Sequence, residues 1–393
     1  MQNQFLSAAS DGFVPARLTS ARNARGMRQN ELAEAVGCAP GTISKWESLA
    51  YGQSPDQGAI LSLSDKLSVS PSWFYKPITA NEGAAFFRSM KSALQTARNK
   101  TLGKLRFVDD IFNAAFGRVE FPDVDIPNLM EGRDYKTIRS EDIDQIARQL
   151  RDYWCLSDDP IDDLMVVIEN AGIVVSEDFV DSAKLDGVSQ WIDNRPLMLL
   201  AKDKEGGVRR RFDAAHELGH LVLHQSVSAS DIEKDIALIE EQAMIFAGSF
   251  LLPSSSFASD ISVVTLDALA DSKPKWKVSI GAMIKRASNL HLVTPEHERN
   301  LWKYYSYRSW RGNEPHDDRM HVEQPVNLKT AVEMIAEDGS GEIKAFVDEI
   351  GLPVEDIARL TGVNTDIFAG SRERPKLKLV TKRSSQSVAA AND

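Results

Sequence analysis

One short segment, RRFDAAHELGHLVLHQ, constrains the fold of this chain more than any other part of its sequence. Apolar and small residues dominate it, which predicts a helix buried in a core. His216 and His220 are four residues apart and therefore lie on one face of that helix. Two imidazoles and the carboxylate of Glu217 are costly to bury there unless they pair with one another or bind a ligand. The segment therefore predicts a polar site inside an apolar core.

The spacing of these residues is typical of a zinc site. Two histidines one helical turn apart can present both imidazoles to one metal ion, and Glu217 can hold and deprotonate a water molecule at that ion. The pattern H-E-x-x-H also occurs by chance in proteins that bind no metal. Metal binding is favoured because the motif follows a predicted pair of strands, lies in an apolar helix and precedes a second helix with acidic residues.

A third protein ligand is expected from that second helix, IEEQAMIFAGSFLLP. Glu240 fits best, because the small and apolar residues at helical spacing from it mark the face that packs inward. Glu241 is the weaker choice, and Glu233 and Asp235 are more distant alternatives. His224, one turn beyond the motif, could be an additional ligand or a transition-state donor, but a polar end of the helix is the favoured interpretation.

With these flanks, the chain resembles the ImmA/IrrE family of zinc metallopeptidases. The resemblance rests on His216 to His220 followed by Glu240-x-x-Ala243-x-x-Phe246-Ala247-x-x-Phe250-Leu251-Leu252-Pro253, and with the flanks LRDYWCLSDDPIDDLMVVIENAGIVV and WKVSIGAMIKRASNL it covers roughly residues 84–325. It implies cleavage of a partner protein, typically a helix-turn-helix repressor, which derepresses genes. The expected site holds one zinc ion per chain on His216, His220 and Glu240, with Glu217 as general base. Met244 departs from the family, which usually has Asn or Asp there.

The first ~75 residues predict short helices with tight turns, which form a compact bundle. Within them, Gln29-x-x-Leu32-Ala33-x-x-Val36-Gly37-Cys38-x-x-Gly41-Thr42-Ile43-Ser44-Lys45-Trp46-Glu47 resembles the helix-turn-helix of lambda-repressor-like (XRE-type) regulators. Gly37 makes the turn between the two helices. The resemblance implies that the second helix lies in the major groove of double-stranded DNA.

Direct base readout is expected mainly from Thr42, Ser44 and Lys45, because Pro40 and Gly41 offer little to base edges. The candidate contacts to the DNA backbone or a base edge are Gln29, Arg22, Arg25 and Arg28. A helical protein–protein module that has lost DNA affinity is the alternative. It is considered because basic residues are few and the chain has a net charge of −11, so that DNA binding would need a dimer.

The fold class is expected to be α+β and mostly α. The predicted domains are a helix-turn-helix domain (1–77), a helical linker (78–135), a zincin-like, gluzincin-type metallopeptidase domain with a small sheet (136–325), a C-terminal helical region (326–370) and a disordered tail (371–393). Short strands are expected at 173–175, 188–192 and 197–200, and one long helical stretch at about 84–117. No internal repeat is apparent.

The composition indicates a soluble protein of a reducing compartment. Cys38 and Cys155 are its only cysteines and lie far apart, which is unlike a disulfide framework. The start, MQNQFLSAASDGF, does not read as a signal peptide, and no apolar run is long enough to cross a bilayer. We therefore expect a cytoplasmic protein without membrane contact.

These observations predict a transcription regulator that binds a two-fold operator as a homodimer and cleaves a repressor or antitoxin with its zinc endopeptidase domain. The alternative is a non-proteolytic regulator or antitoxin in which the peptidase fold serves as a sensor or interaction domain. A third hypothesis is that the peptidase cuts its own chain in the predicted linker, 78–135.

Overall fold

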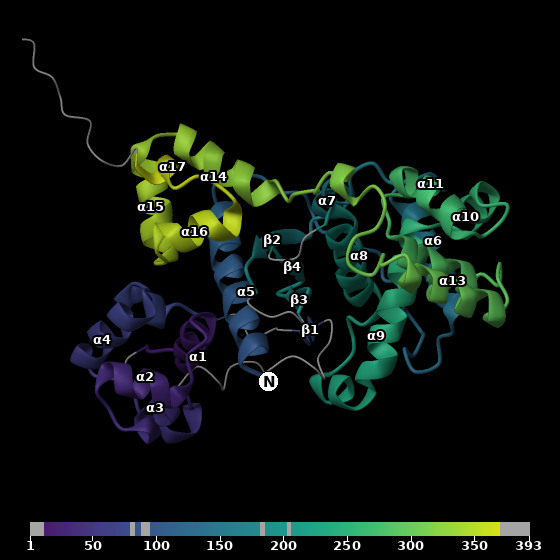
Figure 1. Ribbon diagram of the computed structural model, residues 1–393. Coiled ribbons are helices and arrows are strands. Elements are labelled where there is room, and N and C mark those ends of the chain that lie inside the picture. Colours follow the sequence, from purple (N-terminus) through teal and green to yellow (C-terminus); the bar gives the residue numbers. More distant parts are fainter. Residues whose placement is uncertain (1–11, 79–82, 88–94, 181–184, 203–205, 370–393) are drawn as a thin grey trace, which may run out of the picture.

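The computed structural model describes residues 12–78, 83–87, 95–180, 185–202 and 206–369. Most of these residues are helical, and one small sheet lies near the middle of the molecule (Figure 1). The expected α+β, mostly α fold is therefore confirmed. The predicted tail at 371–393 lies outside the described residues, and the predicted domain boundaries stay predictions.

The N-terminal bundle has its helices where the sequence predicts them. They are α1 (Pro15–Ala24), α2 (Gln29–Val36), α3 (Pro40–Trp46) and α4 (Gln57–Leu67), with the short 3-10 helices η1 (Leu49–Tyr51) and η2 (Pro71–Tyr75). Gly37 ends α2 with a φ of +75°, a conformation that residues with a side chain rarely adopt. Pro40 opens α3, where the first turn needs no backbone N–H. These two residues set the turn between the helices.

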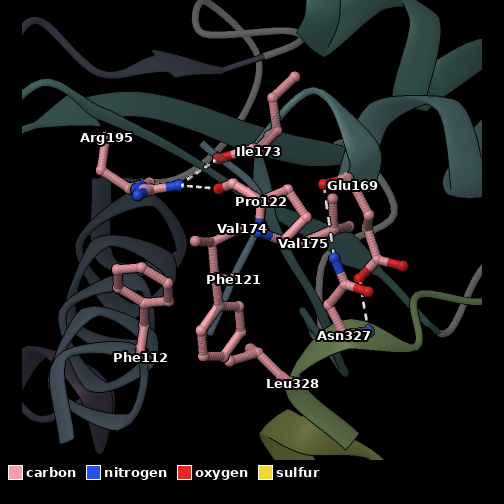
Figure 2. Close-up of a pocket in the computed structure, with 11 residues that line it drawn as sticks. Phe112, Phe121, Pro122, Glu169, Ile173, Val174, Val175, Arg195, Asn327 and Leu328 are labelled. Atoms are coloured by element: carbon pink, nitrogen blue, oxygen red, sulfur yellow. Dashed lines mark hydrogen bonds between the residues drawn. The ribbon is translucent and has the colours of Figure 1, made fainter. Parts of the chain in front are cut away.

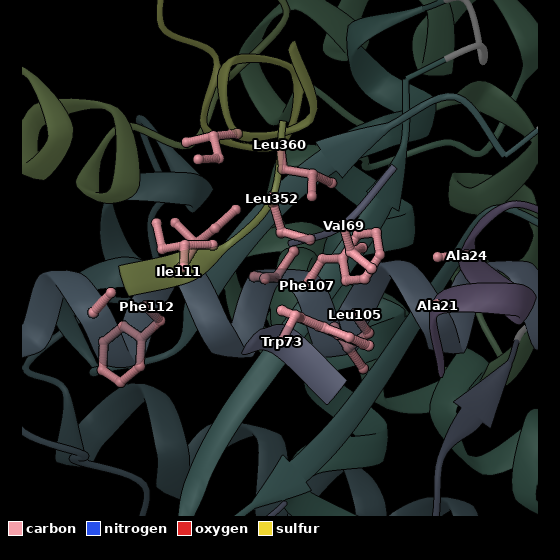
Figure 3. Close-up of a cluster of buried hydrophobic side chains, with 14 of the residues drawn as sticks. Ala21, Ala24, Val69, Trp73, Leu105, Phe107, Ile111, Phe112, Leu352 and Leu360 are labelled. Carbon is pink, nitrogen blue, oxygen red and sulfur yellow. The ribbon is translucent and has the colours of Figure 1, made fainter. Parts of the chain in front are cut away.

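Helix α5 (Gln95–Phe116) is a central packing element rather than an exposed linker. Side chains of the N-terminal bundle, the sheet and the C-terminal helices share one apolar core around it, in which Trp73 packs edge-on against Phe107 with ring centroids 5.6 Å apart (Figure 3). Gly103 allows α5 to approach α1 closely, because a Cβ there would lie 2.3 Å from the backbone nitrogen of Ala24.

The prediction of a helix from about Ala84 is wrong for the described residues that precede Gln95. Phe86–Phe87 form strand β1, which pairs antiparallel with strand β3 (Gly187–Ile192). Short apolar runs do not distinguish a strand from a helix by periodicity alone. Only the free edge of β3, a tertiary partner, selects the extended conformation.

The sheet has four strands in the order β1-β3-β4-β2. The hairpin of β3 and β4 (Arg195–Ala201) is antiparallel, and β2 (Val174–Asp178) runs parallel to β4. Asp193 and Asn194 both have positive φ, as a two-residue hairpin turn requires. The sequence therefore predicts three of the four strands.

The two faces of the sheet pack against different helices. Met198 and Leu200 of β4 point into a core with α6 (Ser140–Tyr153) and α8 (Gly207–Leu223), whereas Leu197 and Leu199 point into the core around α5. Further helices on the α8 side are α7 (Leu164–Asn170), α9 (Ala229–Leu251), α10 (Ser254–Asp260), α11 (Leu266–Trp276), α12 (Ile280–Asn289) and α13 (Pro295–Tyr307), with η3 (Asp317–Arg319) after them. The sequence does not predict α10, α11 or α13.

No single helix among the described residues has the length and apolar composition needed to cross a membrane. The bent pair α9 and α10, at 64°, meets those two criteria only when taken together.

The C-terminal helices are attached through a buried carboxylate at the end of α7. Glu169 accepts hydrogen bonds from the backbone N–H of Val326 at 2.8 Å and of Asn327 at 2.9 Å, where α14 (Asn327–Glu337) begins (Figure 2). Burial raises the pKa of Glu169 to about 7, although the two hydrogen bonds act in the opposite direction. Nearby, Arg195 donates to the carbonyl oxygen of Pro122 at 2.8 Å.

The last helices, α15 (Ser340–Ile350), α16 (Val354–Thr361) and α17 (Asp366–Ala369), repeat the pattern of α1, α2 and α3. No repeat is apparent in the sequence, and the likeness is one of helix order and glycine position. α2 and α16 each have 8 residues, and each follows and precedes a glycine with positive φ. These glycines are Gly26 and Gly37 around α2, and Gly351 and Gly362 around α16. The equivalent buried pairs are Leu18 and Ile343, Ala21 and Phe346, Leu32 and Ile357, Ala33 and Ala358, and Ile43 and Phe368. Only glycines and interchangeable apolar residues recur, so the repeat is inconspicuous in the sequence.

The two similar units contact each other beside α5. The guanidinium of Arg25 lies 2.5 Å from the carboxylate of Asp356, and the backbone N–H of Ser70 donates to the carbonyl of Gly351 at 2.8 Å. The ammonium of Lys76 donates to the carbonyl of Ile350 at 2.8 Å. The C-terminal unit therefore holds the helix-turn-helix unit in place through ionic and backbone contacts.

Candidate metal centre and nucleic-acid interface

Helices α8 and α9 pack closely enough to bring their polar residues together. Gly219 on α8 makes this possible, because a Cβ there would lie 3.1 Å from the ring of Phe246 and 3.3 Å from the Cα of Ala243. Apart from its polar residues, α8 is buried among apolar side chains on nearly all sides. The predicted buried helix is therefore confirmed, and its glycine determines how near α9 lies.

His216, His220 and Glu240 converge on one point between these helices. The Nε2 atoms of the two histidines are 3.0 Å apart, and the Glu240 carboxylate oxygens lie 3.6 Å from His216 Nε2 and 3.4 Å from His220 Nε2. One ligand atom from each of the three residues lies within 4.8 Å of the others. Both imidazoles are fully buried, and the Glu240 side chain is 20% exposed. Two imidazoles and a carboxylate are the donor set of a zinc site.

The geometry favours Glu240 over the other acidic residues of α9. Glu241 and Glu233 are exposed, and the Asp235 carboxylate accepts a hydrogen bond from Tyr135 Oη at 2.8 Å. Burial alone would raise the pKa of Glu240, but its interactions with the two histidines outweigh burial and hold the pKa well below its usual range. The carboxylate is therefore ionised, as a metal ligand must be.

His224 is the polar residue that ends α8, as the favoured interpretation expects, but it lies inside the protein. It is fully buried, its Nδ1 lies 3.1 Å from His220 Nδ1, and its Nε2 lies 3.0 Å from Gln242 Oε1. Burial is the main cause that lowers the pKa of His224 to about 3, so its ring is neutral at physiological pH.

This contact chain selects the tautomer of His220. Gln242 donates its amide N–H to the carbonyl of Tyr135 at 2.6 Å, which turns its oxygen towards His224. Neutral His224 must then donate from Nε2 to that oxygen and accept at Nδ1. His220 therefore donates from Nδ1 and presents the lone pair of Nε2 to the site, which is the form that binds a metal ion.

Glu217 lies next to the three ligand candidates and is held by the sheet. Ser189 of β3 donates its hydroxyl to Glu217 Oε2 at 2.7 Å, and the Glu217 side chain is buried. Gly187 on the same strand leaves room for it, because a Cβ at Gly187 would lie 3.1 Å from Glu217 Oε1. The structure thus places a carboxylate of fixed orientation beside the candidate metal site.

Met244, where the family resemblance leads one to expect Asn or Asp, points away from this site. Its side chain is 39% exposed. His220 instead donates a hydrogen bond to His224, and His224 is oriented by Gln242, which lies on the same helix as Met244. Hydrogen bonding to a ligand candidate is therefore present despite the departure at Met244.

The helix-turn-helix residues lie on an open surface. Ser44, Lys45 and Arg28 are exposed, and Thr42 is half-buried on the same helix as Ser44. Gln29 lies at the start of α2, where its side-chain amide donates to Glu47 at 2.7 Å. These residues share the surface formed by the start of α2 and by α3.

Two arginines predicted to contact the DNA backbone are engaged within the protein. Arg22 is buried and donates to Glu47 Oε1 at 2.6 Å, and Arg25 pairs with Asp356. Both therefore stabilise the unit rather than face outward. Their guanidinium groups pair with carboxylates that only the tertiary structure brings close. The sequence alone therefore does not indicate that these two arginines are engaged within the protein.

The sequence analysis missed Gln242 and Ser189 as positioning residues of the metal centre. Gln242 carries a signal in retrospect, because it is a polar residue on the inward face of an apolar helix. We identify no such sequence signal for Ser189, because serine is common in strands that are exposed on one face.

Two segments of the chain match the models of known families. Residues 18–74 match the model of a helix-turn-helix family, and residues 168–288 match that of the IrrE N-terminal-like domain, a peptidase family. The second match includes Ser189, Glu217, Glu240 and both histidines of the candidate site. No curated protein matches the chain.

Proposed function

We propose that this chain, which combines an XRE-type helix-turn-helix DNA-binding domain with an IrrE-like peptidase domain, is a regulator that cleaves a partner protein by zinc-dependent endopeptidase chemistry. The observation that carries the proposal is the convergence of His216, His220 and Glu240 within 4.8 Å, with Glu217 next to His216 on α8. The expected partner is a repressor or antitoxin, and its cleavage would switch gene expression.

The residues present fit zinc as the resident metal. His216, His220 and Glu240 would hold one ion per chain, and the contact chain through His224 fixes the lone pair of His220 for this purpose. A zinc ion there would polarise the scissile carbonyl and stabilise the charge that develops on its oxygen.

Glu217 would act as the general base of the reaction. Its carboxylate would accept the proton of the attacking water and later give that proton to the leaving nitrogen. The hydrogen bond from Ser189 keeps one oxygen of the carboxylate fixed during both transfers. A general base held in this way needs no rearrangement before it acts.

The helix-turn-helix unit would bind a double-stranded DNA operator, with Thr42, Ser44 and Lys45 at the bases and Gln29 and Arg28 nearby. Because the exposed basic residues are few, we expect a homodimer on a two-fold site, which doubles the contacts. The chain would be cytoplasmic, as an operator-binding protein must reach DNA.

Metal analysis of purified protein tests the centre first. We expect about one zinc per chain in the wild type and its loss in His216→Ala and Glu240→Ala. Glu241→Gln, a change in the exposed neighbour of Glu240, is the matched control and should retain zinc. A wild type that stays free of zinc when zinc is supplied would refute the proposed centre.

Proteolysis is tested separately, by labelling new N-termini in a native cell extract incubated with the zinc-loaded protein. Wild type should generate termini that are absent with Glu217→Gln. If both proteins hold zinc and give the same termini, the chain is a non-proteolytic regulator whose peptidase fold serves as a sensor or interaction domain.

A further inference from the structure

Strand β1 lies across the candidate metal centre, although it comes from the segment between the helix-turn-helix unit and α5. It pairs antiparallel with the edge of β3, with Phe86 opposite Ser189 and Phe87 opposite Val188. Just before it, the backbone N–H of Gly83 donates to Trp191 O at 2.8 Å, and Gln190 donates its side-chain amide to Gly83 O at 2.8 Å. The segment Gly83–Phe87 is therefore bound to β3 in an extended conformation.

The side chain of Phe86 covers one of the ligand candidates, His220. Its ring is stacked on that of His220, with centroids 4.9 Å apart and an interplanar angle of 10°, and lies 5.7 Å from that of His224. Phe86 is only 2% exposed. Its pocket is completed by Tyr135, Val227, Ile232, Ile236 and Ile239. An aromatic side chain in an apolar pocket thus covers one face of the His220 ring.

One residue connects this segment to the reacting groups. Ser189 is the register partner of Phe86 and also donates the hydrogen bond to Glu217. In an antiparallel pair, opposite residues lie on the same face of the sheet. The backbone at Phe86 therefore runs beside the carboxylate that would activate water, where a polypeptide substrate must lie.

We propose that Gly83–Phe87 is an internal inhibitor that occupies the place of the substrate, and that the substrate is an extended segment with an aromatic side chain at the position of Phe86. This inference rests on the proposed peptidase function. A substrate would add a strand to β3 by the same main-chain pairing, which supplies affinity, while the Phe86 pocket supplies specificity.

The segment is suited to exchange with another strand. A paired strand of two residues is short, and the edge that it covers is a ready template for another chain. Gly83 permits the close approach to β3, because a Cβ at this position would lie 3.2 Å from Trp191 Cβ and 3.3 Å from Trp191 O. Two separate features, the glycine and the aromatic ring, therefore hold the segment, and each can be altered alone.

Zinc exchange tests the covering role without measuring catalysis. In Phe86→Ala and Gly83→Val, zinc uptake and zinc loss to a chelator should both accelerate by at least about tenfold, as expected when a buried anchor is removed. The zinc affinity should stay the same, because removal of the cover accelerates zinc uptake and zinc loss by the same factor. Phe257→Ala, which removes a buried phenylalanine of α10, is the control and should leave the rates unchanged. Unchanged rates in both Phe86→Ala and Gly83→Val would overturn the covering role.

Peptide binding tests the substrate role. A fluorescent peptide ANEGAAFFRSM, which copies residues 80–90, is titrated into Glu217→Gln protein with or without Gly83→Val. We expect at least about tenfold tighter binding when Gly83→Val is present, and loss of binding when alanine replaces the first phenylalanine of the peptide. Equal binding by both proteins would overturn the proposal.

Two further outcomes separate this inference from the proposed function. If the wild type holds no zinc yet the peptide binds as expected, the strand site stands and the peptidase proposal fails. If zinc-loaded wild type cuts itself at Gly83–Phe87 while Glu217→Gln does not, the segment is a substrate and the inhibitory role is overturned.

Discussion

The metal centre and the helix-turn-helix surface differ in how their functional side chains are held. His216 and His220 are fully buried, and a chain of hydrogen bonds fixes the orientation of the second one. Ser44 and Lys45 are exposed and have freedom to adjust. The comparison teaches that the candidate metal centre is organised before any ligand binds, whereas the proposed DNA contacts would form only with the DNA. Substitutions at one site should therefore leave the other unaffected.

The largest effect that we expect is on catalysis alone. Glu217→Gln should lower the cleavage rate of a partner protein about 10²–10⁴-fold, the usual contribution of a general base. Zinc content and operator affinity should not change, because the ligands and the DNA-contacting face are unaltered. Rate measurements at saturating zinc check this, and a variant of unchanged rate would exclude Glu217 as the base.

The second largest effect that we expect comes from the hydrogen bonds that orient the ligand candidate His220. Gln242→Leu removes the partner that orients His224 and should weaken zinc binding about 10–100-fold, as for other residues that orient a ligand. Competition with a zinc chelator measures the affinity. Met244→Ala, an exposed change on the same helix, should leave it unaltered. Equal affinities in the two variants would show that the chain through His224 has no such role.

At the helix-turn-helix surface, Lys45→Ala should weaken operator binding about 5–100-fold, because the substitution removes a proposed base contact. The zinc content should not change. Lys66→Ala on α4 is the control, since Lys66 lies on another helix of the bundle. Titrations at several salt concentrations distinguish the two kinds of contact. Loss of a phosphate contact reduces the salt slope by about one, whereas loss of a base contact changes sequence preference.

The smallest effect should come from the contact between the two similar helical units. Asp356→Asn removes the charge that pairs with Arg25 and Arg359, and should lower the free energy of unfolding by about 1–2 kcal/mol for this partly buried pair. Asp366→Asn, at an exposed position of the same unit, is the control. Denaturant titration measures the difference, and equal midpoints would contradict the role given to the ion pair.

Much of the fold was predictable because its signals are local. The spacing of His216 and His220, the glycine turn at Gly37 and the hairpin turn at Asp193 each act within a few residues. Strand β1 was not predictable in this way, because its partner lies about a hundred residues later in the chain and nothing within Phe86–Phe87 selects a strand.

The same distinction between local and long-range signals holds for the residues of the candidate site. The sequence by itself determined the two histidines, Glu217 and Glu240, because helical periodicity places the first three on α8 and turns the fourth inward on α9. Only the tertiary structure decided that His224 and Gln242 orient His220, and that Arg22 and Arg25 are engaged within the protein. It also placed Phe86 over the centre. The physical reason is range: periodicity fixes which face of a helix a residue occupies, whereas the partner on that face depends on packing between distant segments.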